Sequence, residues 1–260
     1  MAEMTNQSVS RPVNRPANPF GGGIQMALVA ILVTLMGFWP TFFSRLGSID
    51  AAHLLHGTLS TGWLVLVLVQ ASLIRFRKFK WHRTIGWISL LWFALLVATS
   101  CYMLTLMLSG TGPTPIPFGM AKIFAFSDVT ALPLMIIAYA GAITLRKDRH
   151  VHSRLMSVTL LAGLMPAIAR AFLYIFIAAG IAAATSMNDV LKALTLAMHP
   201  TFIFVLVVLA TAILFDYKKD RLRWPFPFAF VWFAINYATF FPGLSSQWFD
   251  HVAKAIAAMA

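Results

Sequence analysis

The sequence predicts an all-α, polytopic membrane protein, a bundle of seven transmembrane helices with a cytoplasmic N-terminus. Apolar residues make up 60% of the 260-residue chain and charged residues only 11%, a balance that an ordinary soluble domain does not have. The apolar residues gather in seven runs, each near the roughly 20 residues that a helix needs to cross a bilayer. Most of the 20 Lys and Arg residues lie in the N-terminal tail and in alternate loops between these runs.

The seven runs are separated by short connections, so no loop is long enough to fold as a soluble domain. We expect an extended or disordered cytoplasmic tail over 1–23, a transmembrane domain over 24–243 and an outer-surface amphipathic helix over 244–260, where apolar residues recur at helical spacing. The predicted spans are roughly 24–43, 51–74, 84–108, 120–145, 154–180, 190–215 and 224–242.

The basic loops predict the orientation, because short loops rich in Lys and Arg stay on the cytoplasmic side. They follow the second, fourth and sixth runs, which places the N-terminus inside and the C-terminus outside. The net charge of +12 is thereby assigned to topology and to contact with membrane lipid, and a nucleic-acid partner is not expected. The basic residues are Arg75, Arg77, Lys78, Lys80 and Arg83, then Arg146, Lys147, Arg149 and Arg154, then Lys218, Lys219, Arg221 and Arg223.

Five polar residues, each on a different predicted helix, share the outer half of the membrane: His56, Asp128, Arg170, His199 and Asn236. They lie about 8 to 15 Å below the helix ends at 1.5 Å per residue. Intramembrane polar groups usually face the bundle interior, so we expect them to converge on one pocket. Asp128 and Arg170 are the expected ion pair, either as a binding site or as a link between two helices. The predicted pocket residues are His56, Ser60, Trp63, Gln70, Asp128, Arg170, Tyr174 and Asn236.

The histidines offer two sets of metal or haem ligands, because neutral imidazole binds both. An outer set comprises His53, His56 and His199, and an inner set comprises His82 and His152. The alternative is that each histidine only bridges helices or, at the inner face, meets lipid phosphate. A zinc hydrolase built from His56, Asp128 and His199 is a weaker option.

The chain contains the motifs His53-x-x-His56-Gly57, Trp63, Gln70, His82-Arg83-x-x-Gly86, Phe118-Gly119, His152-x-Arg154-x-Met156 and Arg170. Together they resemble a widespread family of uncharacterised bacterial seven-helix membrane proteins, and the resemblance implies a multi-pass protein of the bacterial inner membrane. The histidine sets bear a more distant similarity to transmembrane di-haem b-type cytochromes, which implies haem b held by histidine pairs near both membrane faces.

Three functions from different classes therefore stay open. The first is a redox protein that binds haem b and transfers electrons. The second is a protein that binds or transports a small molecule or lipid through the outer pocket. The third is an accessory subunit of a larger membrane complex, or a homo-oligomer, with no chemistry of its own. Whether the chain is an enzyme is not determined by these patterns.

Overall fold

The computed structural model describes residues 23–112 and 115–260, and these parts of the chain contain helices and no strands. The N-terminal tail expected at 1–23 lies almost wholly outside the described residues. The helices are α1 (Gly23–Phe38), the 3₁₀ turn η1 (Phe43–Arg45), α2 (Ala51–Arg75), α3 (Phe79–Ser109), α4 (Phe118–Thr144), α5 (Arg149–Ala178), α6 (Met187–Lys218), α7 (Pro225–Leu244) and α8 (Gln247–Ala257).

Six helices, α2 to α7, are long and apolar enough to cross a membrane, so the chain is a multi-pass membrane protein. The remaining apolar helix, α1, has 16 residues and a length of about 24 Å, short of the roughly 30 Å hydrocarbon core. Its expected span reached residue 43. The helix ends at Phe38 because Pro40 disfavours helical geometry at the preceding Trp39.

The outer surface of the bundle is apolar, as a lipid-facing surface must be. On α3 alone, Trp87 is 70% exposed and Leu91 67% exposed. Contiguous apolar surface of this kind is rare on soluble monomers. These side chains therefore face the acyl chains rather than water.

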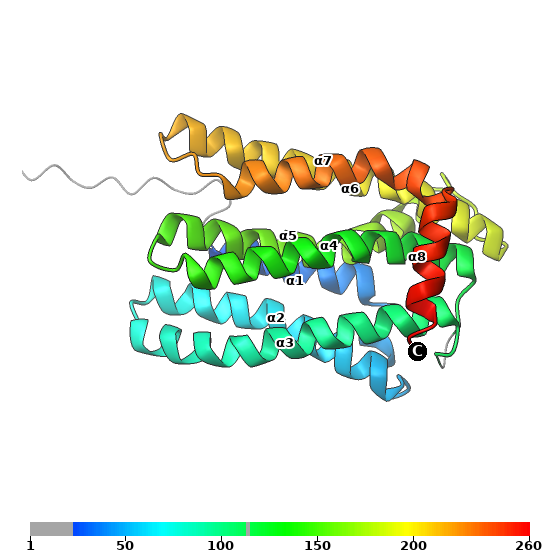
Figure 1. The fold of residues 1–260 in the computed structure, drawn as a ribbon, viewed down its shortest axis with the longest axis horizontal. Coiled ribbons are helices and arrows are strands. Elements are labelled where there is room, and N and C mark those ends of the chain that lie inside the picture. Colours follow the sequence, from blue (N-terminus) through cyan, green and yellow to red (C-terminus); the bar gives the residue numbers. More distant parts are fainter. Residues whose placement is uncertain (1–22, 113–114) are drawn as a thin grey trace, which may run out of the picture.

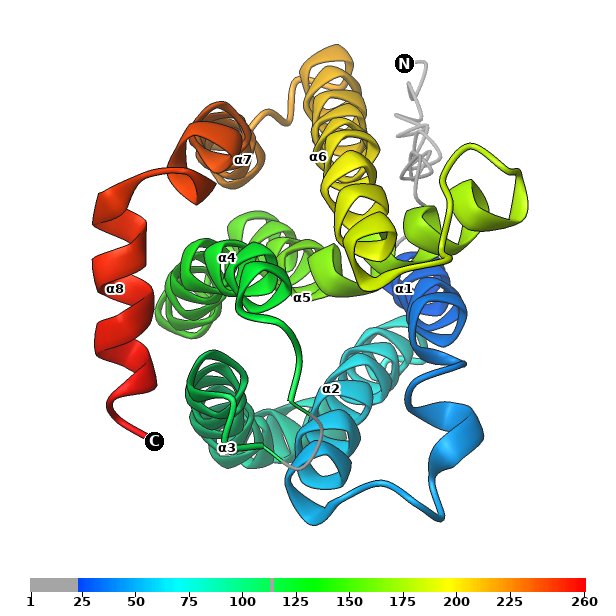
Figure 2. The same cartoon turned by 90° about the vertical axis from the view of Figure 1, so that its right-hand side faces the viewer.

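The central helix is α5, which contacts α1, α2, α4, α6 and α7. Viewed along the bundle (Figure 2), the α2–α3 hairpin lies on one side of the α4–α5 pair and the α6–α7 hairpin on the other. Close packing of α1 on α5 depends on Gly37, where an added Cβ would lie 2.3 Å from the Ala167 carbonyl oxygen. Small residues permit this approach of helix backbones in membranes.

The three basic loops lie at one end of the bundle, on the left in Figure 1. They are the α2–α3, α4–α5 and α6–α7 connections. We call this the basic end. The α3–α4 and α5–α6 connections and α8 lie at the opposite end.

At the opposite end, α8 runs across the bundle next to α3, α4 and α7. Its first turn is capped by Ser246, whose Oγ accepts from the Phe249 N–H at 3.2 Å. Phe249 and Ala253 are buried against the bundle, and Asp250 forms an ion pair with Lys122 of α4. The segment after the last span is therefore attached to the bundle by both apolar and ionic contacts.

Candidate functional site

The inner histidines, His82 and His152, face each other at the basic end. His82 lies in the first turn of α3 and His152 in the first turn of α5. Their ring centroids are 6.3 Å apart and the ring planes are nearly perpendicular, at 84°. Both helices begin at the basic end, which is why residues 70 positions apart in sequence meet there.

Local capping fixes where α5 begins and hence where His152 lies. Asp148 is the N-cap residue, and its Oδ1 accepts from the His150 N–H at 2.9 Å and the Val151 N–H at 3.1 Å. The Val151 hydrogen bond, followed by that from His150, lowers the pKa of Asp148 below its ordinary value although desolvation opposes the shift. The carboxylate therefore stays ionised and satisfies helix N–H groups that have no partner within the helix.

The ring nitrogens of the histidine pair are only partly bonded. Nδ1 of His152 lies 2.8 Å from the Ala142 carbonyl oxygen, so it donates a proton and leaves Nε2 with a free lone pair. His82 lies against Gln70 of α2. Its buried Nδ1 and the buried Oε1 of Gln70 have no hydrogen-bond partner in the described chain. Such groups cost about 1–3 kcal/mol each, so the cluster can accept a ligand.

An aromatic block lies about two turns deeper than this pair. Trp63, Phe93 and Tyr139 meet there, with Phe93 and Tyr139 stacked at 4.1 Å between centroids. The Tyr139 hydroxyl shares a hydrogen bond of 2.7 Å with Ser89, whereas the buried Trp63 Nε1 has no partner among the described residues. Sequence reasoning missed Tyr139 and Ser89. The available signal for both residues was a hydroxyl group in an otherwise apolar helix.

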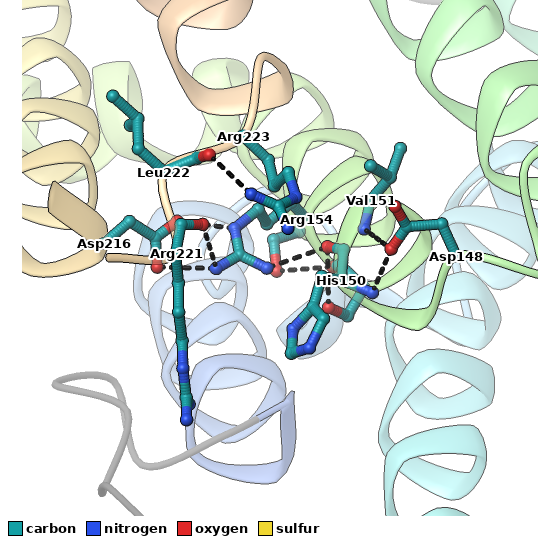
Figure 3. Close-up of polar contacts among 10 residues, drawn as sticks. Asp148, His150, Val151, Arg154, Asp216, Arg221, Leu222 and Arg223 are labelled. Carbon is teal, nitrogen blue, oxygen red and sulfur yellow. Dashed lines mark hydrogen bonds and ion pairs between the residues drawn. The ribbon is translucent and has the colours of Figure 1, made fainter. Parts of the chain in front are cut away.

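A buried ion pair joins α5 to α6 two residues after His152 in the chain (Figure 3). Arg154 Nε and Nη2 donate to the two Asp216 carboxylate oxygens at 2.5 and 2.6 Å. Arg154 also donates to the carbonyl oxygens of His150 at 2.9 Å and Arg221 at 3.3 Å. Arg154 was used as a topology signal and as part of a family motif, whereas Asp216 was missed. An acidic residue directly before a basic loop could have indicated the pairing.

The outer histidines on α2 have separate, local partners. His56 lies 3.3 Å from Thr99 Oγ1 of α3 and 3.3 Å from Ser60 Oγ. His53 pairs with Asp50 at 2.7 Å, and Asp50 also caps α2. The His56 contact with Thr99 joins two helices, as the alternative expects, whereas the His53 contact with Asp50 is local to the start of α2.

The third outer histidine, His199, is committed to α6 and α7. Its Nδ1 lies 3.0 Å from the Tyr237 hydroxyl, and its ring stacks on Phe241 at 4.1 Å. In the described chain, no group of three or more His, Cys, Asp or Glu side chains could hold a metal ion. The expected zinc set of His56, Asp128 and His199 is therefore not assembled, because its histidines belong to different helix pairs.

The expected contact between Asp128 and Arg170 is also not made. No nitrogen–oxygen distance between them is within the 4.0 Å of an ion pair. Arg170 instead lies between two aromatic rings, with its guanidinium carbon 4.6 Å from the Phe38 centroid and 4.4 Å from the Phe124 centroid. Tyr174 lies four residues after Arg170, one turn along the same face of α5.

Asn236 lies apart from the other predicted pocket residues. Its Nδ2 donates to the Trp232 carbonyl oxygen at 2.8 Å, and it lines an apolar groove of about 730 Å³ between α4, α7 and α8. The predicted pocket residues therefore divide among several helix pairs. Trp63 and Gln70 lie toward the basic end, near the inner histidines. Arg170 and Asp128 lie toward the opposite end.

The chain gives no match in comparisons with protein families, curated proteins or solved structures. The inner histidine pair is the most complete candidate site, because α3 and α5 bring two imidazoles to 6.3 Å between ring centroids and the buried His82 Nδ1 has no hydrogen-bond partner in the described chain. An outer haem site built from His53, His56 and His199 has no comparable pairing.

Proposed function

We propose that His82 and His152 would hold one haem b, and that the protein is a membrane redox protein. The observation that carries the proposal is the facing pair of imidazoles on α3 and α5, 6.3 Å between ring centroids. Neutral imidazoles are good ligands for haem iron.

The surroundings of the pair fit such a group. Metal-bound histidine usually donates its other ring N–H to a carbonyl or carboxylate, as His152 Nδ1 does toward Ala142. Gly86, one turn after His82, lies next to Gln70, since an added Cβ would meet Gln70 Nε2 at 3.6 Å. The exposed Arg83 lies at the same end and supplies positive charge for haem propionates.

When bound, haem b would supply one-electron transfer. The residues of the chain orient the group and exclude water. The Ala142 carbonyl holds the His152 tautomer, and the Trp63, Phe93 and Tyr139 block closes the site toward the membrane centre. We further propose the bacterial inner membrane as the location, with the basic end and the N-terminus in the cytoplasm, because the basic loops share one end.

Optical spectroscopy of protein purified from haem-replete cells tests the proposal. We expect a Soret band that shifts on reduction, and its loss in a His82→Ala, His152→Ala double variant. His56→Ala, His199→Ala and the surface variant His251→Ala are the controls and should keep the band. Absence of Soret absorbance before and after haemin titration would overturn the proposal, and so would retention of haem in the double variant.

A further inference from the structure

Arg170 is a second unexplained feature, remote from the histidine pair. It lies on α5, 18 residues beyond His152, which is about 27 Å along a helix. It is eight residues from the end of α5 at Ala178, about 12 Å inside the opposite end. A guanidinium at this depth is costly unless it has a counter-charge, a partner or a path to water.

The guanidinium of Arg170 is fixed in orientation but sparsely bonded. The rings of Phe38 and Phe124 lie 4.6 and 4.4 Å from its central carbon. Of its five N–H donors, the described chain occupies only one, through Nη1 to the Pro166 carbonyl oxygen at 3.1 Å. Arg154, on the same helix, makes four hydrogen bonds. The contrast shows that Arg170 keeps donors free.

Asp128 of α4 is the complementary group. It lies ten residues into its helix, about 15 Å from the opposite end, and so shares the depth of Arg170. Asp128 lies four residues after Phe124, whose ring contacts the Arg170 guanidinium, so it is one turn along the same face of α4. No direct ion pair joins the two groups. Both side chains are half-buried.

We propose that Arg170 and Asp128 form a binding site for a small zwitterion, in which Arg170 binds a carboxylate or phosphate and Asp128 binds an ammonium group. A guanidinium held between aromatic faces presents its edge to two oxygens at once, the geometry that favours bidentate binding of carboxylate or phosphate. A simple anion would meet repulsion from Asp128, and a simple cation would meet repulsion from Arg170. A zwitterion matches both charges.

Two sources can supply this chemistry, namely a soluble amino compound or the head group of phosphatidylethanolamine. Thermal unfolding in nanodiscs of pure phosphatidylglycerol separates them. One arm adds glycine, β-alanine, γ-aminobutyrate or phosphoethanolamine, with acetate and methylammonium as single-charge controls. The other arm replaces part of the phosphatidylglycerol with phosphatidylethanolamine. We expect at least one zwitterion to raise the Tm by several degrees near saturation, and the single-charge compounds to have little effect.

Variants give the site a specific signature. Arg170→Lys should abolish the ligand-induced Tm shift, because a lysine cannot bind two oxygens in fork geometry. Asp128→Asn should lose the response to zwitterions and gain a response to acetate. Matched controls are Arg146→Lys and Asp220→Asn at exposed positions of the basic end, which should keep the wild-type response.

A purely structural Arg170 would lower the Tm of Arg170→Lys without any ligand-dependent difference. That result, or the absence of a shift with every zwitterion in both arms, would overturn the proposal. The haem proposal is independent of this outcome, because its Soret readout depends on His82 and His152 alone.

Discussion

Arg154 of α5 and Asp216 of α6 meet in a two-point contact, with nitrogen–oxygen distances of 2.5 and 2.6 Å. Both residues are buried, with exposures of 8% and 6%. Because Arg154 also binds the Arg221 carbonyl oxygen, the contact joins α5, α6 and the loop that leads to α7. It fixes the central helix against the third hairpin next to the histidine pair.

Removal of one partner of this pair should be strongly destabilising. Arg154→Ala leaves an uncompensated buried carboxylate, and we expect it to lower the free energy of unfolding by about 3 kcal/mol. Reversible unfolding in mixed micelles measures the change, with Arg146→Ala as the exposed control. The Arg154→Met, Asp216→Leu double variant should recover most of the loss. Wild-type stability in Arg154→Ala would show that the pair does not contribute.

A methyl group at Gly37 should separate α1 from α5. An added Cβ would lie 2.3 Å from the Ala167 carbonyl oxygen, whereas nothing lies within 4 Å of the corresponding position at Gly47. Gly37→Ala should therefore cost about 1–3 kcal/mol through overpacking, while Gly47→Ala should have little effect. Thermal unfolding of the two variants side by side makes the comparison. Equal melting temperatures would contradict this packing.

Protonation of Asp250 should weaken the attachment of α8. The hydrogen bond from Lys122, with the charge of the same group, holds the pKa of Asp250 below its ordinary value of 3.8. The folded-state pKa is thus the lower one, so the stabilisation is complete above pH 3.8 and disappears as the pH falls through the lowered pKa. The Tm of wild type should exceed that of Asp250→Asn at pH 6, and the difference should shrink below pH 3.8. A difference that does not change with pH would argue against the ion pair, and Asp220→Asn is the matched control.

The hydroxyl and indole groups of the aromatic block should behave differently on deletion. Tyr139→Phe removes the hydrogen bond with Ser89 and should cost about 1 kcal/mol. Trp63→Phe removes a buried N–H that has no partner. The stability lost through reduced packing should therefore be partly offset by the removal of this unsatisfied donor. Thermal unfolding should place Tyr139→Phe below wild type. Haem loading of Trp63→Phe would show independently whether the indole N–H faces a ligand.

Cysteine labelling tests the orientation. Cys101 lies exposed on α3 and is first replaced by serine. A cysteine at position 220, in the basic α6–α7 loop, should react with a membrane-impermeant maleimide only after the cells are permeabilised. A cysteine at position 112, between α3 and α4, should react in intact cells. The reverse pattern would place the basic end outside.

The helices could be predicted from sequence because their signals are local. Apolar runs and Lys- or Arg-rich loops marked α2 to α7 to within several residues. The end of α1 was predicted too late because the effect of Pro40 on Trp39 was not considered. Depth alone suggested that His56 and His199 share a pocket, but depth does not specify which way a helix is rotated or which hairpins are neighbours. The pairing of His82 with His152 could be predicted, because it depended only on two loops that lie at the same end of the bundle.

Pairs that require three-dimensional proximity were harder to predict. Asp128 and Arg170 have opposite charges and similar depth, yet the aromatic rings of Phe38 and Phe124 hold the guanidinium. Asp216 lies 62 residues after Arg154, and no periodic pattern connects the two. Such pairings follow from packing angles between hairpins, which single-helix periodicity does not contain.

The position of Asp216 also has a consequence for biogenesis. An arginine near the centre of a helix costs about 2.5–3.5 kcal/mol during translocon insertion, and α5 carries Arg170 as well as Arg154 near its start. The carboxylate that neutralises Arg154 is synthesised 62 residues later, which at about 5–20 residues per second is a delay of roughly 3–12 s. We therefore expect α5 to remain beside the translocon until the end of α6 emerges, so that the two helices enter the lipid together.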